Sequence, residues 1–576
     1  MPNPDLILLH PPNIYDFRFR TILYGPISDL IPSTPVFEMY PIGFTTIAEY
    51  LERHGFKVRI INLAMRMLAS NRFNPEKLIA SLNPLAFGID LHWMPHCHGA
   101  IEIARIIKKH HPQTPVIFGG FSSTYYHREL IERPEVDFVI RGDSTEEPVL
   151  LLMKRLRGDK DAPPFEAIPN LTWKDGKGEI HVNPLTWSPP DLNYVLLDYS
   201  YVVKAVVRYR DLISFIPFKG WLGYPITAVL TCRGCTYSCR TCGGSAYAFR
   251  KMHGRLKPAY RDPELLAKDI RGIARFSKGP IFILGDLRQA GMDYAERFFR
   301  AIRGYTGPVI VELFDAADRE FLRELARALP NFVLEISLES HSDEVRHAFG
   351  RPYTTAQAEA TMEYALEAGC KRLDVFFMIG LPRQDFQSVM ETVDYAGKLI
   401  REFNRGKEPR LFPFISPMAP FLDPGSEAFE NPEQFGYRVF YRSLEEHRRA
   451  LEMPSWKYFL SYETVWMSRE EIVESTYEAG LRLNELKKAY GLISHRRAED
   501  VASRIRKARS LIRQIDEVLT MSRSDLREKF LSALKPQVDG ANTSTVCDKE
   551  ELNLKLGPLN LRFLRSATIL LRGSEL

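Results

Sequence analysis

Short apolar runs alternate with amphipathic stretches over the first 157 residues. Five runs have the length and composition of buried strands. The segments between them repeat their apolar positions about every three to four residues, which is typical of helices. Strands separated by helices form parallel βαβ units, so we predict a doubly wound parallel sheet. The predicted strands are 5–10, 57–62, 85–89, 115–118 and 136–140, and the predicted helices are 41–54, 75–81, 99–110 and 147–156.

The residues that follow these strands indicate where a ligand would bind. In doubly wound sheets, ligands bind beyond the carboxyl ends of the strands. The predicted strand ends carry Asp90, Gly119-Gly120 and Arg141-Gly142. We therefore expect this edge of the first domain, residues 1–157, to form a binding site.

A second, longer alternation begins after a connector. Residues 158–222 contain a hairpin around Asp175-Gly176 and are otherwise rich in proline and aromatic residues. Residues 223–420 contain six strand–helix units, which predict a full or partial barrel with its active site at the C-terminal strand ends. The predicted strands are 226–230, 280–284, 308–314, 332–338, 372–379 and 411–415.

Residues 421–576 are predicted to form a helical region with many charged residues of both signs. Its clearest helices cover 438–451, 468–490 and 499–520. Basic residues in the last helix are interleaved with acidic ones, so we interpret it as a solvated face and not as a phosphate site. A polar spacer at 539–544 and a short apolar tail end the sequence.

Composition excludes several classes of protein. The chain has 576 residues, of which 45% are hydrophobic and 26% charged, as in soluble globular proteins. A net charge of +5 argues against nucleic acid as an obligate partner. The most apolar segment, 212–230, is interrupted by Pro217, Lys219 and Pro225, so we expect no membrane span. No secretory signal is recognisable, and we expect a cytoplasmic protein.

Four cysteines crowd one segment: Cys232, Cys235, Cys239 and Cys242. In a reducing compartment such crowding indicates metal or redox chemistry. Structural zinc sites usually pair two CxxC knuckles across a longer spacer, whereas compact runs are typical of a loop around an iron–sulfur cluster. If only the last three bind, a [4Fe–4S] cluster keeps one iron open for catalysis. Cys232 could be a fourth ligand, so structural zinc and electron transfer remain alternatives.

The segment Cys235–Cys242 resembles the signature of the radical S-adenosylmethionine (SAM) enzymes. Residues 335–346, with Gly350-Arg351 beyond them, and residues 377–382 are similar to the fourth and fifth barrel strands of that family, in the same order. The first domain, with Gly119-Gly120 and residues 136–143, resembles the cobalamin (B12)-binding domain often fused ahead of this barrel. The resemblance covers residues 1–420 and is specific for the combination.

The resemblance implies the cofactors and their contacts. In this family three cysteines hold a [4Fe–4S] cluster whose open iron binds SAM, and SAM is cleaved to a 5′-deoxyadenosyl radical. The implied positions are Cys235, Cys239 and Cys242 for the cluster, Gly285, Asp286, Ser337, Glu339 and Gly380 for SAM, and Gly88, Gly119, Gly120 and Gly142 for cobalamin. Read without the family, Gly285-Asp286 could be an ordinary strand-to-helix turn, and Glu339 could be a helix N-cap partner.

Three features depart from the pattern of the family. Thr241 stands where an aromatic residue is common, which weakens the expected adenine contact. Arg383 stands where Gly-Glu-Thr usually continues, and we expect a surface role for it over carboxylate or phosphate binding. Asp90-Leu-His92 resembles the motif whose histidine binds cobalt, but it follows the third strand and not the first. We expect His92 to be a polar loop residue, with no histidine beneath the cobalamin; a domain that has lost cobalamin is the alternative.

The resemblance implies a cobalamin-dependent radical SAM enzyme that acts on an unactivated carbon, mainly by C-methylation. The alternative is radical C–C bond or ring formation on a lipid, such as an archaeal tetraether isoprenoid chain. Aromatic residues in 215–224 and 456–459 suit a lipid-like substrate, but such residues also pack domain interfaces.

The alternative outside enzymes is an iron–sulfur electron-transfer protein or a zinc-stabilised protein. The expected partners are a small-molecule or lipid substrate and an electron donor such as a reductase, ferredoxin or flavodoxin. Any membrane contact would be peripheral. No side chain is assigned a catalytic role.

Overall fold

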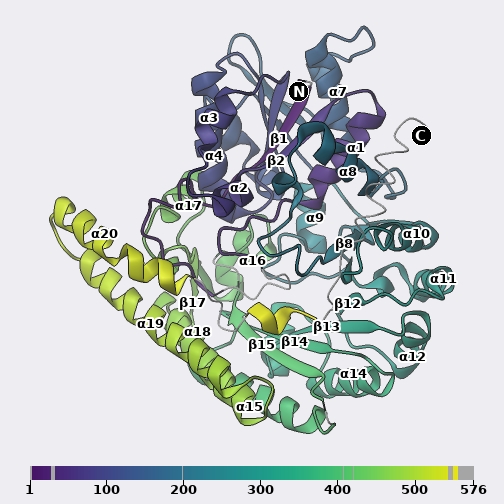
Figure 1. Cartoon of the computed structure of the whole chain (residues 1–576), viewed down its shortest axis with the longest axis vertical. Helices are drawn as coiled ribbons and strands as arrows, with labels where there is room; N and C mark the ends of the chain where they lie inside the picture. Colours follow the sequence, from purple (N-terminus) through teal and green to yellow (C-terminus); the bar gives the residue numbers. More distant parts are fainter. Residues whose placement is uncertain are drawn as a thin grey trace.

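The computed structural model describes residues 3–26, 33–197, 199–406, 408–418, 421–542 and 549–554. Two sheets lie one above the other, and three long helices run along one side of the second sheet (Figure 1). These helices are α18 (Arg469–Ala489), α19 (His495–Leu519) and α20 (Ser524–Ala541). The overall architecture is the predicted one: a doubly wound sheet, a six-stranded partial barrel and a helical C-terminal region.

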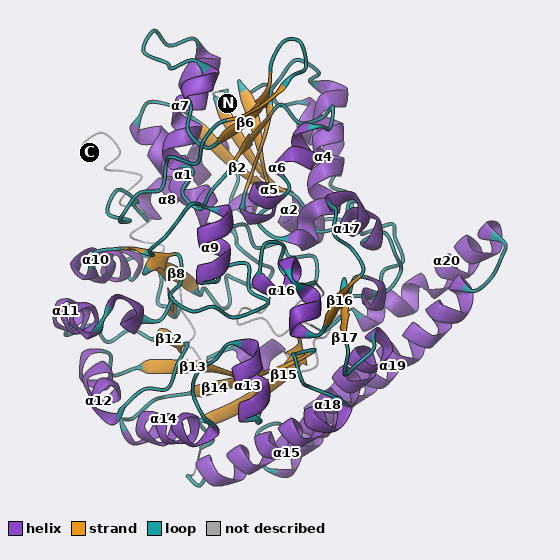
Figure 2. Ribbon diagram, turned by 180° about the vertical axis from the view of Figure 1, so that it is seen from behind, coloured by secondary structure: helices purple, strands orange, loops and turns teal. Residues whose placement is uncertain are grey.

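The first sheet has seven strands in the order β2-β1-β3-β4-β5-β6-β7. β1 to β5 are parallel and lie between helices on both faces (Figure 2), which explains their continuous apolar sequences. The five predicted parallel strands are confirmed. They are β1 (Leu6–His10), β2 (Val58–Asn62), β3 (Ala86–Asp90), β4 (Val116–Gly119) and β5 (Phe138–Ile140), and the larger flanking helices are α1 (Ile42–Arg53), α4 (Cys97–His110) and α7 (Glu146–Arg157).

The predicted hairpin continues this first sheet. It consists of β6 (Leu171–Lys174) and β7 (Ile180–Val182), and β6 pairs antiparallel with β5. The sheet therefore extends beyond residue 157, where the alternation in the sequence ends. Hydrophobic periodicity does not show which sheet an isolated hairpin joins, because an edge strand is set by tertiary pairing.

The second sheet has six parallel strands in the order β15-β14-β13-β12-β11-β8. Since β15 and β8 do not pair, the sheet is a partial barrel. All six predicted strands are present, with helices packed outside them. The strands are β8 (Thr227–Leu230), β11 (Ile281–Leu284), β12 (Val309–Leu313), β13 (Phe332–Glu339), β14 (Leu373–Ile379) and β15 (Leu411–Pro417), and the main helices are α10 (Pro263–Ile273), α11 (Met292–Ile302), α12 (Arg319–Ala328), α14 (Thr355–Glu367) and α15 (Phe386–Phe403).

The aromatic residues of the connector fill the N-terminal end of this partial barrel. Phe218 and Tyr224 form a buried cluster with three residues near the beginnings of strands: Phe282, Ile310 and Val333. Phe215 lies in a core cluster of the first unit. The suggestion that residues 215–224 suit a substrate is corrected, because these side chains pack cores away from the C-terminal strand ends.

The C-terminal region differs partly from the prediction. α18 and α19 are present, but residues 438–451 are not one helix: β16 (Tyr437–Val439) is followed by α17 (Leu444–Ala450). A capping box between Ser443 and Glu446 begins α17. α20 was not predicted, and it runs through the first residues of the predicted polar spacer; residues 555–576 of the apolar tail lie outside the described residues. Within the described chain, no helix combines the length and hydropathy that crossing a bilayer requires.

Candidate active site

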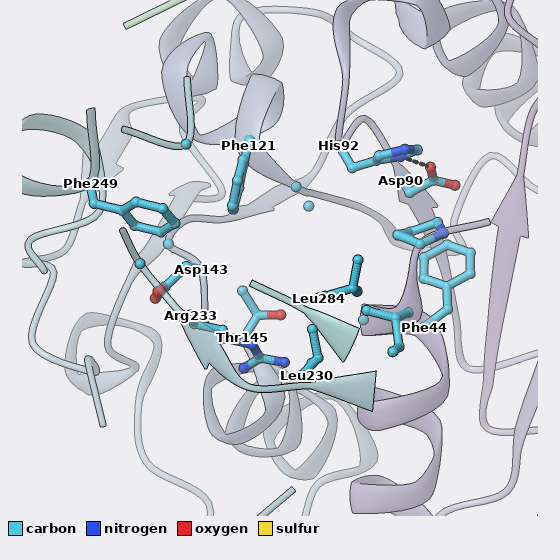
Figure 3. Close-up of a pocket in the computed structure, with 18 of the residues that line it drawn as sticks. Phe44, Asp90, His92, Phe121, Asp143, Thr145, Leu230, Arg233, Phe249 and Leu284 are labelled. Atoms are coloured by element: carbon cyan, nitrogen blue, oxygen red, sulfur yellow. Dashed lines mark hydrogen bonds and ion pairs between the residues drawn. The ribbon is translucent and has the colours of Figure 1, made fainter. Parts of the chain in front are cut away.

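A cavity of about 560 Å³ lies between the carboxyl edge of the first sheet and the first strands of the partial barrel (Figure 3). The first unit contributes residues of β1, β3, β4 and α1 to its walls. The second contributes the ends of β8 and β11 and the loop that carries the four cysteines. The two regions predicted to bind different cofactors therefore share one space.

The four glycines predicted to contact cobalamin all line this cavity: Gly88, Gly119, Gly120 and Gly142. A Cβ added at Gly120 would lie 2.5 Å from the Cα of His92. Gly120 also has a φ of +114°, which is strained for residues other than glycine. A Cβ at Gly88 would lie 2.7 Å from Leu8 Cδ2. These contacts with the protein's own chain exclude a side chain at Gly120 and Gly88. Four glycines in the lining leave bare backbone at the cavity wall, which fits a large flat ligand such as cobalamin.

Asp90 connects two histidines at the edge of this cavity. His92 Nδ1 donates to Asp90 Oδ2 at 2.6 Å, and His10 Nδ1 lies 3.0 Å from Oδ1. Burial alone would raise the pKa of Asp90, but the charges and hydrogen bonds of His10 and His92 outweigh burial and hold this pKa well below its ordinary range. His92 is therefore a hydrogen-bonded loop residue, and it also lines the cavity. His10 meets Asp90 because β3 lies directly beside β1.

The cysteine loop runs from β9 (Cys232–Arg233) to α9 (Ala246–Met252), and all four sulfurs belong to residues that line the cavity. The Tyr237 N–H donates to Cys235 Sγ at 3.4 Å, and the Gly244 N–H donates to Cys242 Sγ at 3.3 Å. Cys232 differs, since its S–H donates to the carbonyl of Gly234 at 3.5 Å. The first two interactions suit thiolate ligands, whereas the third suits a protonated thiol.

The spacing of the sulfurs does not suit a single zinc ion. Zn–S bonds of about 2.3 Å in a tetrahedron place the sulfurs about 3.8 Å apart. In the part of the chain that the structure describes, no three of the cysteine sulfurs lie within 4.8 Å of one another; the group that meets this distance is Asp175, Glu179 and His181 on the β6–β7 hairpin. A wider multi-iron cluster fits the loop better than zinc does.

Arg351 lies beside the cysteine loop and lines the same cavity. Its Nε donates to Glu339 Oε1 at 3.0 Å, and its Nη1 donates to the Phe314 carbonyl at 2.9 Å. Burial raises the pKa of Cys239 to about 11, and the charge of Arg351 opposes that rise. A Cβ at Gly350 would lie 2.7 Å from the carbonyl of Ser238, so the Gly350-Arg351 pair packs directly on the loop.

Glu339 lies beside this arginine with one oxygen unpaired. The residue is 1% exposed and has a φ of +61°, and its Oε2 has no hydrogen-bond partner among the described groups. The N-cap of the following helix, α13 (Asp343–Phe349), is Ser342, so Glu339 is not the cap partner considered from the sequence. An orphaned buried carboxylate oxygen is costly unless a ligand donates to it.

The end of β11 brings together a predicted pair and an unpredicted carboxylate. Gly285 lines the cavity and donates its N–H to Glu312 of β12. Asp286 is occupied by the turn: its carboxylate accepts from the N–H groups of Arg288 at 2.9 Å and Phe314 at 3.0 Å. Burial raises the pKa of Glu312 to about 7. The only signal for Glu312 in the sequence is a charged residue inside the apolar strand Val-Ile-Val-Glu-Leu.

Of the five predicted SAM contacts only Gly285 lines this cavity; Asp286, Glu339, Ser337 and Gly380 lie outside its lining. Ser337 is on β13, where its carbonyl accepts from the Tyr353 hydroxyl at 2.5 Å. Gly380 is covered, because an added Cβ would lie 2.8 Å from the Tyr462 hydroxyl. Arg383 is exposed and pairs with Glu344 at 2.6 Å, in agreement with the expected surface role.

Comparison with known proteins identifies both units. Residues 30–151 match the B12 binding domain, and residues 229–396 match the radical SAM superfamily. Cytidylyl-2-hydroxyethylphosphonate methyltransferase of Streptomyces wedmorensis is 22% identical over 489 residues, which cover 73% of this chain and 86% of the relative. Hopanoid C-3 methylase of Methylococcus capsulatus is 28% identical over 284 residues, 46% of this chain and about half (47%) of that relative.

A solved structure shares the fold over most of the chain. The radical SAM methyltransferase TsrM from Kitasatospora setae, with cobalamin and a [4Fe–4S] cluster bound, superposes with a TM-score of 0.57. The match covers 88% of this chain and 100% of the other at 14% identity. The order of the two domains and the helical C-terminal region therefore form a known architecture.

Proposed function

Because this chain is a radical SAM enzyme with a B12-binding domain, we propose that it methylates an unactivated carbon atom. One observation carries the proposal: the glycine-lined edge of the first sheet and the cysteine loop open into the same cavity. A methyl carrier and a radical source must act on one substrate atom, so their sites have to meet. The names of the relatives support this reaction, since two of those compared are methyltransferases or methylases.

The residues at the cavity fit the cofactors of these domains. Cys235, Cys239 and Cys242 would hold the [4Fe–4S] cluster, and the four glycines would bind cobalamin. Glu312 and Glu339 would contact the methionine end of SAM, because both are enclosed carboxylates beside the cysteine loop. When bound, these groups supply one-electron cleavage of SAM and transfer of a methyl group.

The protein itself provides charge balance and exclusion of water. Arg351 neutralises Glu339 and places its positive charge near Cys235 and Cys239. The cavity walls are largely apolar, with Phe44, Phe121, Phe249, Leu230 and Leu284 around the space (Figure 3). Such walls protect reactive species from side reactions with water. An external electron donor, in a cytoplasmic setting, completes the proposal.

Ring formation on a lipid is the weaker candidate. The aromatic residues in 215–224 that suited it pack core clusters. Methylation explains the glycines at the edge of the first sheet more simply than ring formation does, because cobalamin serves directly as a methyl carrier. We therefore do not extend the proposal to ring formation.

Uncoupled turnover tests the proposed reaction. The protein is reconstituted anaerobically with iron, sulfide and cobalamin, reduced, and supplied with SAM. We expect both 5′-deoxyadenosine and S-adenosylhomocysteine, since the first reports radical cleavage and the second reports methyl transfer. Formation of 5′-deoxyadenosine alone would refute methylation, and formation of neither product would refute the radical SAM assignment of the site.

A further inference from the structure

A second cavity, of about 240 Å³, lies at the C-terminal ends of the last two barrel strands. Met378 of β14 and Ser416 of β15 form its floor, in paired register. Loops that follow β1 and β3, together with α17 and the segment after it, form its other walls. The large side chains that line it are Tyr24, Phe37, Trp93, Met94, Met418, Phe421, Leu451, Trp456 and Phe459.

Among the residues that the structure describes, no charged side chain lines this second cavity. Its polar residues include Asn13, Ser416 and His447. His447 donates from Nδ1 to the Ser443 carbonyl at 2.9 Å, and burial lowers its pKa to about 4, so the ring is neutral at physiological pH. Asn13 is engaged with the Pro35 carbonyl and the Ile14 N–H. The walls therefore offer nothing to a phosphate, a carboxylate or an ammonium group.

Two polar atoms of the lining have no hydrogen-bond partner among the described residues: Nε2 of the buried His447 and the hydroxyl of Ser416. His447 Nε2 can only accept, because Nδ1 donates to Ser443, whereas the Ser416 hydroxyl can donate or accept. A buried hydroxyl without a partner costs stability unless a ligand or water supplies one. One hydrogen-bonding atom of a ligand would satisfy it.

Only a thin partition separates the two cavities. His92 lines the first and its neighbour Trp93 lines the second. The Trp93 ring packs edge-on against Phe37 and Phe421, with centroids 5.2 and 5.5 Å away. Its Nε1–H donates to Asp423 Oδ1 at 3.3 Å, and Asp423 Oδ2 accepts from the Gly243 N–H, beside Cys242, at 2.8 Å. A group in the second cavity would thus lie close to the proposed cluster site.

We propose that the second cavity seats the apolar part of the methyl acceptor: an uncharged ring or chain end that carries at most one hydroxyl or N–H group, bonded to Ser416. The inference rests on the proposed function and names its substrate class. At about 240 Å³ the cavity is below the ~300 Å³ of typical sites for drug-sized ligands, so it takes one end of a substrate. The carbon to be methylated then lies on the Trp93 side.

A small neutral probe tests this assignment in the holoenzyme. 2-Naphthol is titrated by isothermal calorimetry into protein reconstituted with cluster and cobalamin, with and without saturating SAM. We expect binding in both cases. Competition with SAM would overturn the proposal, because the cavity would then belong to the SAM site; absence of binding would overturn it too. Cleavage of SAM is measured in a separate assay without the probe. If the wild type does not cleave SAM, the proposed function fails, whatever the result with 2-naphthol.

Variants locate the probe. Ala450→Phe places a ring into the cavity wall, and we expect the affinity for 2-naphthol to fall by about tenfold or more, while the affinity for SAM stays within about twofold. Ala301→Phe, on the outer helix α11, is the control and should leave both unchanged. Leu451→Trp replaces Ala450→Phe if circular dichroism shows the latter to be unfolded. If a variant that fills the cavity is folded and still binds 2-naphthol as tightly as the wild type, the assignment is refuted.

The hydroxyl of the probe reports on Ser416. 2-Methoxynaphthalene cannot donate a hydrogen bond, so wild type should prefer 2-naphthol. Ser416→Ala should remove this preference by weakening only 2-naphthol. An unchanged preference in Ser416→Ala would show that the polar end of the probe does not meet Ser416.

Discussion

Gly120→Ala tests whether the bare backbone at the carboxyl edge of the first sheet is required. Gly120 has φ +114° and ψ 175°, a region that other residues adopt at a cost of about 1–3 kcal/mol. The new Cβ would lie 2.5 Å from the Cα and 2.6 Å from the N of His92, both backbone atoms that cannot rotate away. Such overpacking adds about 1–3 kcal/mol. The free energy of unfolding should therefore fall by about 2–6 kcal/mol.

Gly119→Ala is the matched control. It adds the same methyl group one residue earlier, where the nearest atom outside its chain neighbours is the Ile140 carbonyl oxygen at 3.9 Å and φ is ordinary. We expect its free energy of unfolding to stay within about 1 kcal/mol of wild type. The first transition in urea, followed by circular dichroism, measures both variants.

Cobalamin binding gives a second readout for the same pair. Relief of the clash in Gly120→Ala requires the loop that carries His92 to shift. The methyl group of Gly119→Ala meets almost no protein atom and lies at the cavity lining, so the affinity for cobalamin, followed by its visible absorbance, should fall in both variants, with a loss of stability only in Gly120→Ala. Equal stability of the two variants would refute the argument that this edge is shaped by close backbone approach.

Three further predictions concern the other groups at the site. Replacing any one of the three proposed cluster cysteines by Ala should abolish iron binding and SAM cleavage. Cys232→Ala should keep both, because the S–H of Cys232 is a hydrogen-bond donor and not a ligand. Loss of iron in Cys232→Ala would indicate four ligands. Because the folded pKa of Glu312 is about 7, above its ordinary 4.5, its contribution to the stability of the cofactor-free protein is fully present below pH 4.5 and is lost as pH rises to about 7, by on the order of 3 kcal/mol. Over this range the urea midpoint of Glu312→Gln should fall less than that of the wild type, and an equal fall would contradict this. Cobalt(II) paramagnetic resonance should show no nitrogen splitting from His92, because this residue follows β3 and not the first strand. Asp90 holds its Nδ1 and leaves Nε2 open, so a splitting lost in His92→Ala would make it a ligand.

The sequence by itself determined the fold class and most of the elements. Strands such as β1 and β14 are buried on both faces, so their apolar runs stand out, and the helices between them carry a strong 3.6-residue period. The cysteine spacing located the loop that borders the cavity, because the four cysteines are close in the chain. The glycines at 119 and 120 were found in the same way, since the end of a strand is a local feature.

Only the tertiary structure decided which distant residues meet. Strand order places β3 beside β1, and so brings His10, Asp90 and His92 together although 80 residues separate the first two. Pairing of β11 with β12 puts Glu312 against Gly285, and the Asp286 carboxylate accepts from backbone N–H groups, as the alternative of a strand-to-helix turn expected. The second cavity combines loops of the first unit with β14, β15 and α17. Hydrophobic periodicity records only whether a side chain is buried, whereas a site depends on which buried side chains face one another.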